Sequence, residues 1–383
     1  MKKRKILVTT GTRAEYGILR PILHAILKSK KLDLYLIVTG MHLSKKHGLT
    51  INEIKKDGFK IFATVDMIPK GDTTYFMSEA VGRGIIEFSK ILNKVRPDIN
   101  LILGDRDEML ASSIAAYHMN IPNAHIHGGD KSGGIDEYNR HAITKISNIH
   151  FAATKKSKER IIKMGENPRY VFFTGSPTVD EIANKQITSK SNLEKKYGIK
   201  FTGKEILLLQ HPVTTQTELA EKQIRTILNA IVKTKRITIA IGPNSDAGNN
   251  KIFETLKLFS RKYPFIKMYR SMPRNDYLGM LENCGVLVGN SSSGMIEAGY
   301  FHIPVINIGT RQEGRERSKN VFDIKDTAVK TIYRTISKAL KSRKTINSID
   351  NYIYGTGNAS KKITSLLEKL DLNKNLIQKQ LSY

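Results

Sequence analysis

Short apolar runs alternate with longer amphipathic stretches along most of this 383-residue chain. Apolar runs of about four to eight residues are typical of buried strands, and apolar positions about three to four apart are typical of covering helices. In the first half the pattern predicts strands at residues 6–10, 34–39, 99–103 and 123–127, helices at 19–27, 77–95 and 109–119, and short apolar runs at 150–153 and 170–174. This alternation favours a parallel sheet wrapped by helices.

The same pattern restarts in the second half of the chain. It predicts strands at residues 206–210, 237–241, 266–269, 286–289 and 305–308, with helices at 219–234, 252–262 and 276–282. The stretch 181–204 is polar, rich in lysine and poor in bulky residues, so we expect the junction there. We therefore predict an α/β protein with two Rossmann-like, doubly wound domains that face a cleft.

The net charge of the chain limits the kind of ligand or partner that we expect. There are 63 Lys plus Arg against 35 Asp plus Glu, a net charge of +28, which favours an anionic partner. The lysines are spread over nearly every predicted helix and tryptophan is absent, whereas a nucleic-acid binder concentrates charge beside stacking aromatics. Lysines spread in this way solvate the protein surface, and what the charge indicates about a ligand supports an anionic small molecule better than nucleic acid.

Two further features limit the class of protein. Cys284 is the only cysteine, which excludes an internal disulfide framework and a thiolate metal cage and fits a reducing compartment. No apolar run approaches the roughly 20 residues of a membrane span, and the run after the basic start is too short for a signal peptide. We expect a cytoplasmic protein without a membrane anchor.

Acid–base side chains gather between two predicted strands of the first half. In open parallel sheets, ligands bind outside the carboxyl ends of the strands. Asp105 follows a strand and a glycine, where a carboxylate either caps the next helix or does acid–base work. His127 and Asp130 lie at a comparable edge. His125 and His127 alternate along a predicted strand without a third ligand at helical spacing, so we expect no metal site.

Asp136 and Arg140 are four residues apart and would share one face if residues 135–146 form a helix. An ordinary surface ion pair has the same spacing. A carboxylate held by such an arginine would act as a base, whereas a desolvated one would act as an acid. The pair therefore remains a candidate for either role.

Several strand ends carry residues suited to a nucleotide. The turn 11–17 with Arg13 fits either a plain strand-to-helix turn or a diphosphate loop. Residues 289–294 read Gly-Asn-Ser-Ser-Ser-Gly, and three serine hydroxyls could surround a diphosphate, with Glu297 accepting from ribose hydroxyls. His211 would either face the same ligand or be hydrogen-bonded within its loop, and the polar turn 242–248, which includes Asn244, allows the same two interpretations. Arg311 is a further candidate cation.

Together these motifs resemble the UDP-N-acetylglucosamine 2-epimerases, most closely the hydrolysing branch that serves the sialic-acid and legionaminic-acid pathways. The similarity runs from about residue 5 to residue 325, in order, through these motifs: Gly11-Thr-Arg-Ala-Glu-Tyr16, Gly104-Asp-Arg106, His125-Ile-His-Gly-Gly-Asp130, Asp136-Glu137, Arg140-His-Ala-Ile-Thr-Lys145, Gln210-His-Pro-Val-Thr-Thr215, Gly289-Asn-Ser-Ser292 and Gly309-Thr-Arg-Gln312.

The resemblance implies roles for individual residues. The uridine diphosphate would contact these side chains: Arg13, His211, Ser291, Ser292, Glu297 and Arg311. Glu15, Arg106 and Asn244 join the candidate substrate contacts through the motifs that hold them. The proton-transfer carboxylates fall on Asp105 and Asp136. A third family position, usually glutamate, falls on His127, so either His127 or the nearby Asp130 would take its place, with Arg140 as a further catalytic candidate.

The family's fold, two Rossmann-like domains of the kind called GT-B, agrees with the alternating pattern. It implies domains at residues 1–180 and 181–354 and a helical tail, 355–383, that could cross back to the first domain. The implied reaction releases UDP and a free manno-configured sugar through a 2-acetamidoglucal. We expect no cofactor, and we expect a homo-oligomer, either a dimer or a tetramer.

Three alternatives remain. A non-hydrolysing epimerase would return the nucleotide-linked epimer. A GT-B glycosyltransferase would pass the sugar to an acceptor and would need only one base, which leaves the second acidic cluster without a purpose. A basic nucleic-acid-binding module would show strongly salt-dependent RNA binding. The sequence does not distinguish UDP-N-acetylglucosamine from UDP-N,N′-diacetylbacillosamine as substrate.

Overall fold

The computed structural model describes residues 3–45, 48–69, 71, 74–131, 135–243, 248–325, 328–346 and 352–382. The chain divides into two compact units. Unit 1 holds residues 1–130, 135–180 and 354–383, and unit 2 holds residues 131–134 and 181–353. The passage from Asp180 to Glu181 falls inside one short helix, α7 (Pro177–Ala183).

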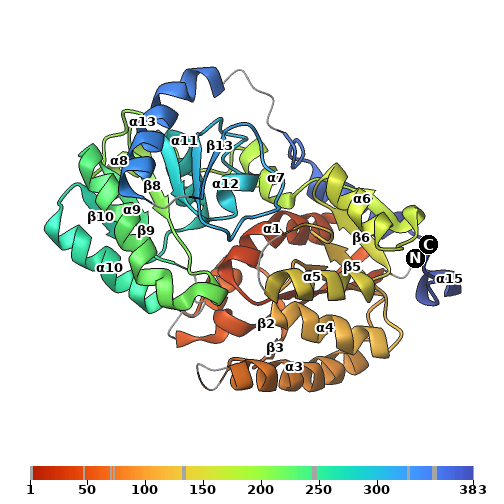
Figure 1. Cartoon of the computed structure of the whole chain (residues 1–383). Coiled ribbons are helices and arrows are strands. Elements are labelled where there is room, and N and C mark those ends of the chain that lie inside the picture. Colours follow the sequence, from red (N-terminus) through yellow and green to blue (C-terminus); the bar gives the residue numbers. More distant parts are fainter. Residues whose placement is uncertain are drawn as a thin grey trace. The chain divides into compact units, whose positions relative to one another are not determined.

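Unit 1 is built on a parallel sheet in the order β3-β2-β1-β4-β5-β6-β7 (Figure 1). Its strands are β1 (Arg4–Thr10), β2 (Leu32–Thr39), β3 (Ile61–Val65), β4 (Ile99–Leu103), β5 (Asn123–Ile126), β6 (Ile149–Ala152) and β7 (Val171–Phe173). Its longer helices are α1 (Arg13–Lys28), α3 (Thr74–Val95), α4 (Asp107–His118), α5 (Ile135–Lys145), α6 (Lys155–Lys163) and α14 (Ala359–Lys369), and its short ones are η1 (Gly40–Leu43), α2 (Ile51–Lys56), η3 (Pro168–Tyr170) and α15 (Lys374–Ile377).

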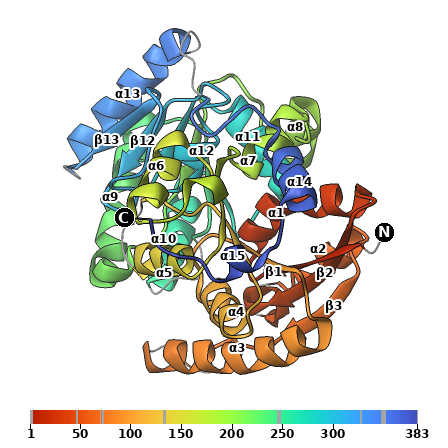
Figure 2. The ribbon, with the colours of Figure 1, turned by 90° about the vertical axis from the view of Figure 1, so that its right-hand side faces the viewer.

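Side chains of β1 separate the unit into two cores, because successive residues of a strand point to opposite faces. Ile6 and Val8 pack in the cluster that includes residues of α1 and α14. Leu7, between them, packs in the cluster that includes Phe88 of α3. Figure 2 shows α14 beside α1, and Ile363 and Leu367 of α14 belong to this core of unit 1.

Unit 2 repeats this plan with a parallel sheet in the order β10-β9-β8-β11-β12-β13. Its strands are β8 (Ile206–Leu209), β9 (Thr238–Ile241), β10 (Ile266–Tyr269), β11 (Val286–Gly289), β12 (Val305–Ile308) and β13 (Val321–Ile324). Its helices are α8 (Lys190–Tyr197), η4 (Thr214–Leu219), α9 (Ala220–Thr234), α10 (Asn249–Lys262), α11 (Arg274–Asn283), α12 (Ser293–Ile296) and α13 (Val329–Ile346). Buried residues of β8, α9, α10 and α13 share one core.

Most elements expected from the apolar pattern are confirmed within a few residues, but two edge strands were missed. β3 alternates partly buried and exposed residues, and β13 is mostly half-exposed, so neither shows the continuous apolar run of a central strand. The stretch 181–204, expected to be a junction, contains α8, which buries Leu193.

The final residues of the chain bind unit 1 through a buried carboxylate. Lys379 Nζ lies 2.7 Å from Glu166 Oε2, and Lys145 Nζ lies 2.8 Å from Glu166 Oε1. Hydrogen bonds from His150, Lys145 and Lys379 outweigh desolvation and lower the pKa of Glu166 to about 2. None of the helices among the described residues is both long and apolar enough to cross a membrane.

Candidate functional site

Asp105 follows β4 and is held by a buried arginine. Arg140 of α5 forms an ion pair with Asp105, and its side chain is only 3% exposed. Another nitrogen of Arg140 donates to the backbone carbonyl of Asp130 at 3.2 Å. The N-cap of α4 is Arg106, so Asp105 is not the capping residue that the sequence allowed. One arginine therefore connects two of the predicted acid–base positions.

His125 supports the turn that carries Asp105. Its Nε2 lies 2.7 Å from the carbonyl oxygen of Gly104, which can only accept, so Nε2 carries the proton. Burial lowers the pKa of His125 to about 3, so the ring is neutral. Gly104 itself has a φ of +80°, a conformation that favours glycine. His125 is thus a structural residue beneath the site.

The expected strand at residues 123–127 ends one residue early. His127 has a φ of +63°, which a strand does not allow, so β5 stops at Ile126 and the expected alternation of His125 with His127 is wrong. A positive φ is strained for a residue with a bulky side chain, and such strain is found where surrounding structure holds it. His127 is buried, 7% exposed.

Asp130 is also buried, and its carboxylate has a specific partner. Ser157 Oγ donates to Asp130 Oδ1 at 2.5 Å, and Ser157 is fully buried. Ser157 lies in the first turn of α6, whose N-cap Thr154 accepts from the Ser157 N–H. Sequence reasoning did not select Ser157, because a serine in the first turn of a helix has no distinctive signal.

Asp136 is half-buried in the first turn of α5, so the predicted helix is confirmed. Asp136 and Arg140 lie one turn apart on that helix. Arg140 forms an ion pair with Asp105, which follows β4. The four-residue spacing alone did not indicate this partner.

The turn after β1 is organised by its own carboxylate. Glu15 Oε2 accepts from the N–H groups of Gly11 at 3.0 Å and Thr12 at 2.9 Å, and Thr12 caps α1 in return. These N–H groups, expected as donors to a phosphate, are therefore used within the turn. Arg13 begins α1 and lies 2.7 Å from Glu53.

A second buried carboxylate lies against the same turn. A Cβ on Gly11 would lie 2.9 Å from Glu108 Oε1, and one on Gly40 would overlap that oxygen, so two glycines make room for it. Arg106 Nε lies 3.2 Å from Glu108 Oε2. Burial first, and Glu108 second, raise the pKa of Glu15 to about 7. Sequence reasoning did not select Glu108.

In unit 2, the loop after β11 is bound to the loop after β8. Asn290 accepts from the N–H of His211 at 2.7 Å and donates to its carbonyl at 2.8 Å. Gly289 has a φ of +132°, and a Cβ there would overlap the carbonyl oxygen of Leu209. The close approach of β8 and β11 at this edge thus requires glycine.

The three serines of this loop have different surroundings. Ser291 is 8% exposed and its Oγ accepts from the N–H of Ser293 at 3.3 Å. Ser292 is the half-buried N-cap of α12. Ser293 accepts from the hydroxyl of Tyr277 and donates to Glu297. The expectation that all three hydroxyls surround a diphosphate is therefore wrong for Ser293.

The remaining unit 2 candidates lie around the same loop. Arg311 donates to the carbonyl of Asn290 at 3.3 Å, and Gln312 donates to it at 3.0 Å. Burial first, and Arg311 second, lower the pKa of His211 well below its usual value, so its ring is neutral. Asn244 lies outside the described residues.

The carboxylate of Glu297 is held on both oxygens. Arg274 NH1 lies 2.7 Å from Oε1, and Ser293 donates to Oε2. Glu297 is 5% exposed. Neither Arg274 nor Tyr277 was selected from the sequence, because both stand outside the strand-end motifs.

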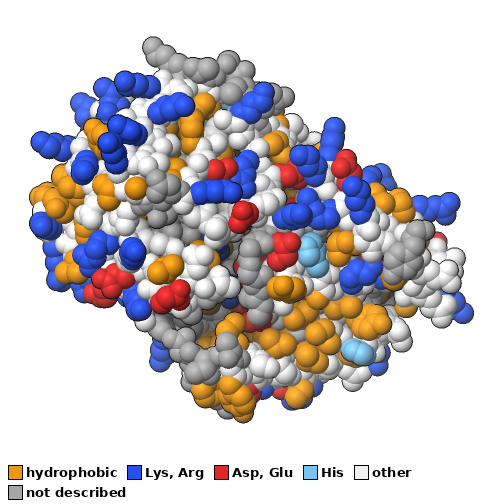
Figure 3. Space-filling model, in the orientation of Figure 1, with side chains coloured by type: hydrophobic (Ala, Val, Ile, Leu, Met, Phe, Trp, Pro, Cys, Tyr) orange, Lys and Arg blue, Asp and Glu red, His pale blue; other side chains and the backbone are white. Residues whose placement is uncertain are grey.

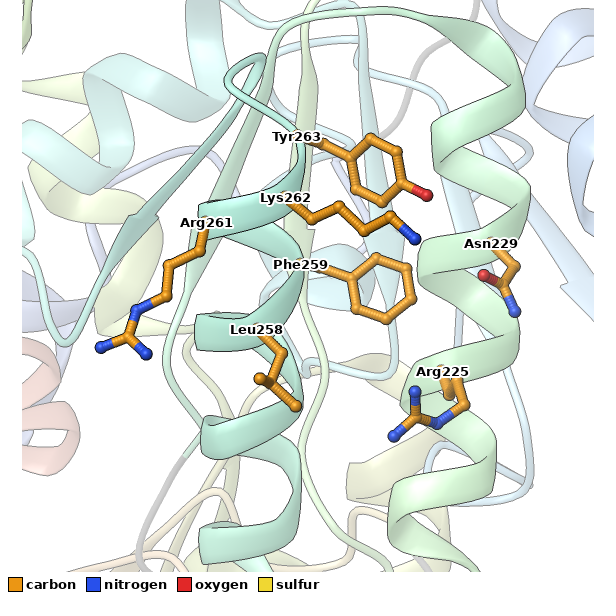
Figure 4. Close-up of a pocket in the computed structure, with 7 residues that line it drawn as sticks. All are labelled: Arg225, Asn229, Leu258, Phe259, Arg261, Lys262 and Tyr263. Atoms are coloured by element: carbon orange, nitrogen blue, oxygen red, sulfur yellow. The ribbon is translucent and has the colours of Figure 1, made fainter.

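A surface pocket of unit 2 lies apart from these residues, between α9 and α10 (Figure 4). The ring of Phe259 in α10 and the ring of Tyr263, directly after α10, point toward α9, and no residue predicted for the site lines the pocket. Within the described ranges, no group of three His, Cys, Asp or Glu side chains could hold a metal ion.

The two parallel sheets place the protein in the class of two-domain Rossmann-like proteins called GT-B. A family model described as UDP-N-acetylglucosamine 2-epimerase matches residues 24–368. The chain belongs to the UDP-N-acetylglucosamine 2-epimerase family, which confirms the resemblance predicted from its motifs.

Relatives cover most or nearly all of the chain. A Legionella pneumophila protein named UDP-N,N′-diacetylbacillosamine 2-epimerase (hydrolyzing) is 38% identical over 99% of this chain and 100% of its own. A Campylobacter jejuni protein named GDP/UDP-N,N′-diacetylbacillosamine 2-epimerase (hydrolyzing) is 35% identical over 84% and 85%. The crystal structure of a Neisseria meningitidis UDP-GlcNAc 2-epimerase bound to UDP-GlcNAc has a TM-score of 0.82 at 20% identity, over 96% of this chain and 100% of that one.

Proposed function

We propose that the protein is a hydrolysing 2-epimerase that converts a UDP-2-acetamido sugar into UDP and the free manno-configured sugar. The observation that carries the proposal is the similarity, over nearly the whole chain, to the hydrolysing enzyme of Legionella pneumophila. That relative also supports UDP-N,N′-diacetylbacillosamine as the first substrate to test, with UDP-N-acetylglucosamine as the second. The product would supply the synthesis of sialic or legionaminic acids.

The reaction needs proton transfer on both faces of the sugar. A base removes the proton at C2 while the bond from C1 to the diphosphate oxygen breaks, which leaves UDP and a 2-acetamidoglucal. An acid then protonates C2 from the opposite face, and water adds at C1 and releases one proton, which leaves a hydroxyl group there. We assign the two proton transfers to Asp105 and Asp136, with His127 or Asp130 assisting.

The ion pair of Asp105 supports its role as the base. A guanidinium beside a carboxylate favours the ionised form, which can accept a proton. Arg140 has that position and also binds the Asp130 carbonyl, so it keeps two candidate groups at one strand edge. Arg140 is therefore proposed as the residue that keeps the base charged.

The unit 2 residues suit the leaving group. Ser291, Ser292 and Arg311 would bind the diphosphate, with the neutral ring of His211 as a further hydrogen-bonding group. Glu297 would accept from the ribose hydroxyls. Among the residues of unit 1, Arg13 and Arg106 are the proposed cationic contacts, and Glu15 shapes the turn that carries Arg13. Hydrogen-bond donors and cations placed around a departing diphosphate stabilise its charge.

The test is product analysis in water labelled with oxygen-18. We expect release of UDP and a free sugar labelled at C1, faster with UDP-N,N′-diacetylbacillosamine than with UDP-N-acetylglucosamine. An unlabelled, nucleotide-linked epimer would instead indicate the non-hydrolysing reaction. UDP release only when an acceptor sugar is added would indicate a glycosyltransferase. The Asp105→Asn variant serves as the blank.

We also propose that the protein forms a homo-oligomer through helices α3, α4 and α5. Figure 3 shows hydrophobic side chains gathered over this part of unit 1. Large apolar residues there are exposed, including Tyr75 at 70%, Ile86 at 59%, Tyr117 at 53% and Tyr138 at 78%. Apolar patches of this kind often mark interfaces.

Sedimentation analysis tests the oligomer. The native chain should sediment as a dimer or tetramer, and Ile86→Asp should sediment as smaller species. The matched control is Leu258→Asp in unit 2, where Leu258 is 55% exposed. A native chain that is monomeric at micromolar concentration contradicts the proposal.

A further inference from the structure

The carboxylate of Glu297 is oriented by two partners that come from different parts of unit 2. Arg274, the first residue of α11, binds Oε1, and Ser293 binds Oε2. A carboxylate oxygen has two lone-pair sites, so each oxygen retains one for another donor. Two free sites on one fixed carboxylate match a pair of neighbouring hydroxyl groups, such as the 2′ and 3′ hydroxyls of ribose.

Arg274 is itself anchored to a second carboxylate. Its Nε lies 3.1 Å from Glu181 Oε2, and the Glu181 side chain is fully buried. The two carboxylates outweigh desolvation and raise the pKa of Arg274, so the guanidinium stays charged. Its planar fork thus receives Glu181 on one side and Glu297 on the other, which fixes both carboxylates in one orientation.

A line of hydroxyl groups fixes the other oxygen. Tyr277 donates to Ser293, and Ser293 donates to Glu297 Oε2. Burial first, and Glu297 second, raise the pKa of Tyr277, so its hydroxyl keeps its proton and acts as the donor. Each hydroxyl in this line therefore donates toward Glu297, and the carboxylate cannot rotate without breaking a hydrogen bond.

We propose that Arg274 is a positioning residue that makes Glu297 selective for a ribonucleotide, with Glu181 as its anchor and the Tyr277–Ser293 line as its second support. This inference rests on the proposed function, which places a uridine nucleotide at Glu297. Arg274 does not touch the reacting carbons, so its loss affects the discrimination between ribose and deoxyribose more than the chemical step.

The experiment compares the affinities of the full-length protein for UDP and for 2′-deoxy-UDP by calorimetry. A hydrogen bond to a charged acceptor corresponds to a preference of about tenfold or more for UDP in the native protein. Arg274→Gln should reduce this preference to below about threefold, as Glu297→Gln should, while the affinity for 2′-deoxy-UDP changes little. Arg274→Lys should restore part of the preference, because it keeps the charge but not the fork.

Two controls separate the possible failures. Arg225→Gln removes an exposed arginine of α9 and should leave the preference at its native value. If Arg274→Gln does not fold, Tyr277→Phe carries the test, since it removes one oxygen atom and should lower the preference severalfold. A native preference in the folded Arg274→Gln or Tyr277→Phe protein overturns the inference. Native protein that does not bind UDP overturns the proposed function first.

Discussion

The strand edges of units 1 and 2 carry similar loops with very different side chains. After β1, β4 and β5, unit 1 places charged groups close to one another: Arg140 forms an ion pair with Asp105, and Glu108 raises the pKa of the buried Glu15. After β8 and β11, unit 2 presents serine hydroxyls, an asparagine clamp and a neutral histidine. Buried charge is costly unless it is paired. Unit 2 keeps its buried charge in the pairs of Arg274 with Glu297 and Glu181, and the loops after its strands offer neutral donors. The charged groups of unit 1 include the ones we propose for proton transfer.

The largest effect should come from the base of unit 1. Asp105→Asn removes the charge but keeps the shape, so we expect turnover to fall about 10² to 10⁴-fold. Affinity for UDP should stay within about threefold of native, because the proposed diphosphate contacts in unit 2 are intact. Turnover by UDP release and affinity by calorimetry check this, with Asp136→Asn as the companion variant. Native turnover in both folded variants would falsify the assignment.

Titration of Glu15 should show the cost of the buried charge in unit 1. Its folded pKa, about 7, lies above its usual 4.5, so its stabilising contribution is complete below about pH 4.5 and is lost as pH rises through 7. Between pH 5 and pH 8, the free energy of unfolding of the native protein should fall by up to about 3 kcal/mol relative to that of Glu15→Gln. Urea unfolding at both pH values measures the difference. A difference independent of pH contradicts the raised pKa.

A smaller effect, on binding rather than on turnover, should follow when the hydrogen bonds between Asn290 and the backbone of His211 are removed. Asn290→Ala removes both hydrogen bonds to the backbone of His211, and we expect affinity for UDP to fall about tenfold. Turnover at saturating substrate should change less than about threefold, because the proposed acid–base groups belong to unit 1. Steady-state kinetics separate KM from kcat. A fall in kcat with unchanged KM would reverse the comparison between the two edges.

The smallest effect should come from the support of Asp130. Ser157→Ala removes the hydroxyl that binds its carboxylate, and we expect kcat to fall about threefold to tenfold with unchanged affinity for UDP. Ser157→Thr keeps a hydroxyl and is the matched control. Unchanged kcat in the alanine variant would assign the assisting role to His127 rather than Asp130.

The sequence predicted the central strands well because each is a continuous apolar run between helices. It also selected the residues of the two edges, since β4 with β5 and β8 with β11 are neighbours and their ends meet. The side chains that bind those residues could not be predicted from the sequence. Arg140 of α5 pairs with Asp105 after β4, and Arg274 reaches Glu297 from the start of α11. Such contacts depend on helix placement, which a local pattern does not contain.

His127 shows a different limit. Its residue type fits an alternating strand, and only the backbone, with a φ of +63°, shows that the chain turns there. Non-glycine residues rarely adopt this conformation, so no sequence pattern predicts it. Likewise, the burial of Glu108 depends on the space that Gly11 and Gly40 leave for its carboxylate, and the sequence alone does not show that these residues meet.

Helix α7 has a consequence for protein engineering. Its neighbouring acids have separate tasks: Asp180 accepts from the N–H groups of Ala359 and Ser360 at the start of α14, and Glu181 holds Arg274. Adding or removing one residue within the helix turns its later side chains by about 100° relative to the earlier ones, so one of these attachments would be lost. Chimaeras with related enzymes should therefore exchange sequence outside residues 177–183 and keep this helix from a single parent.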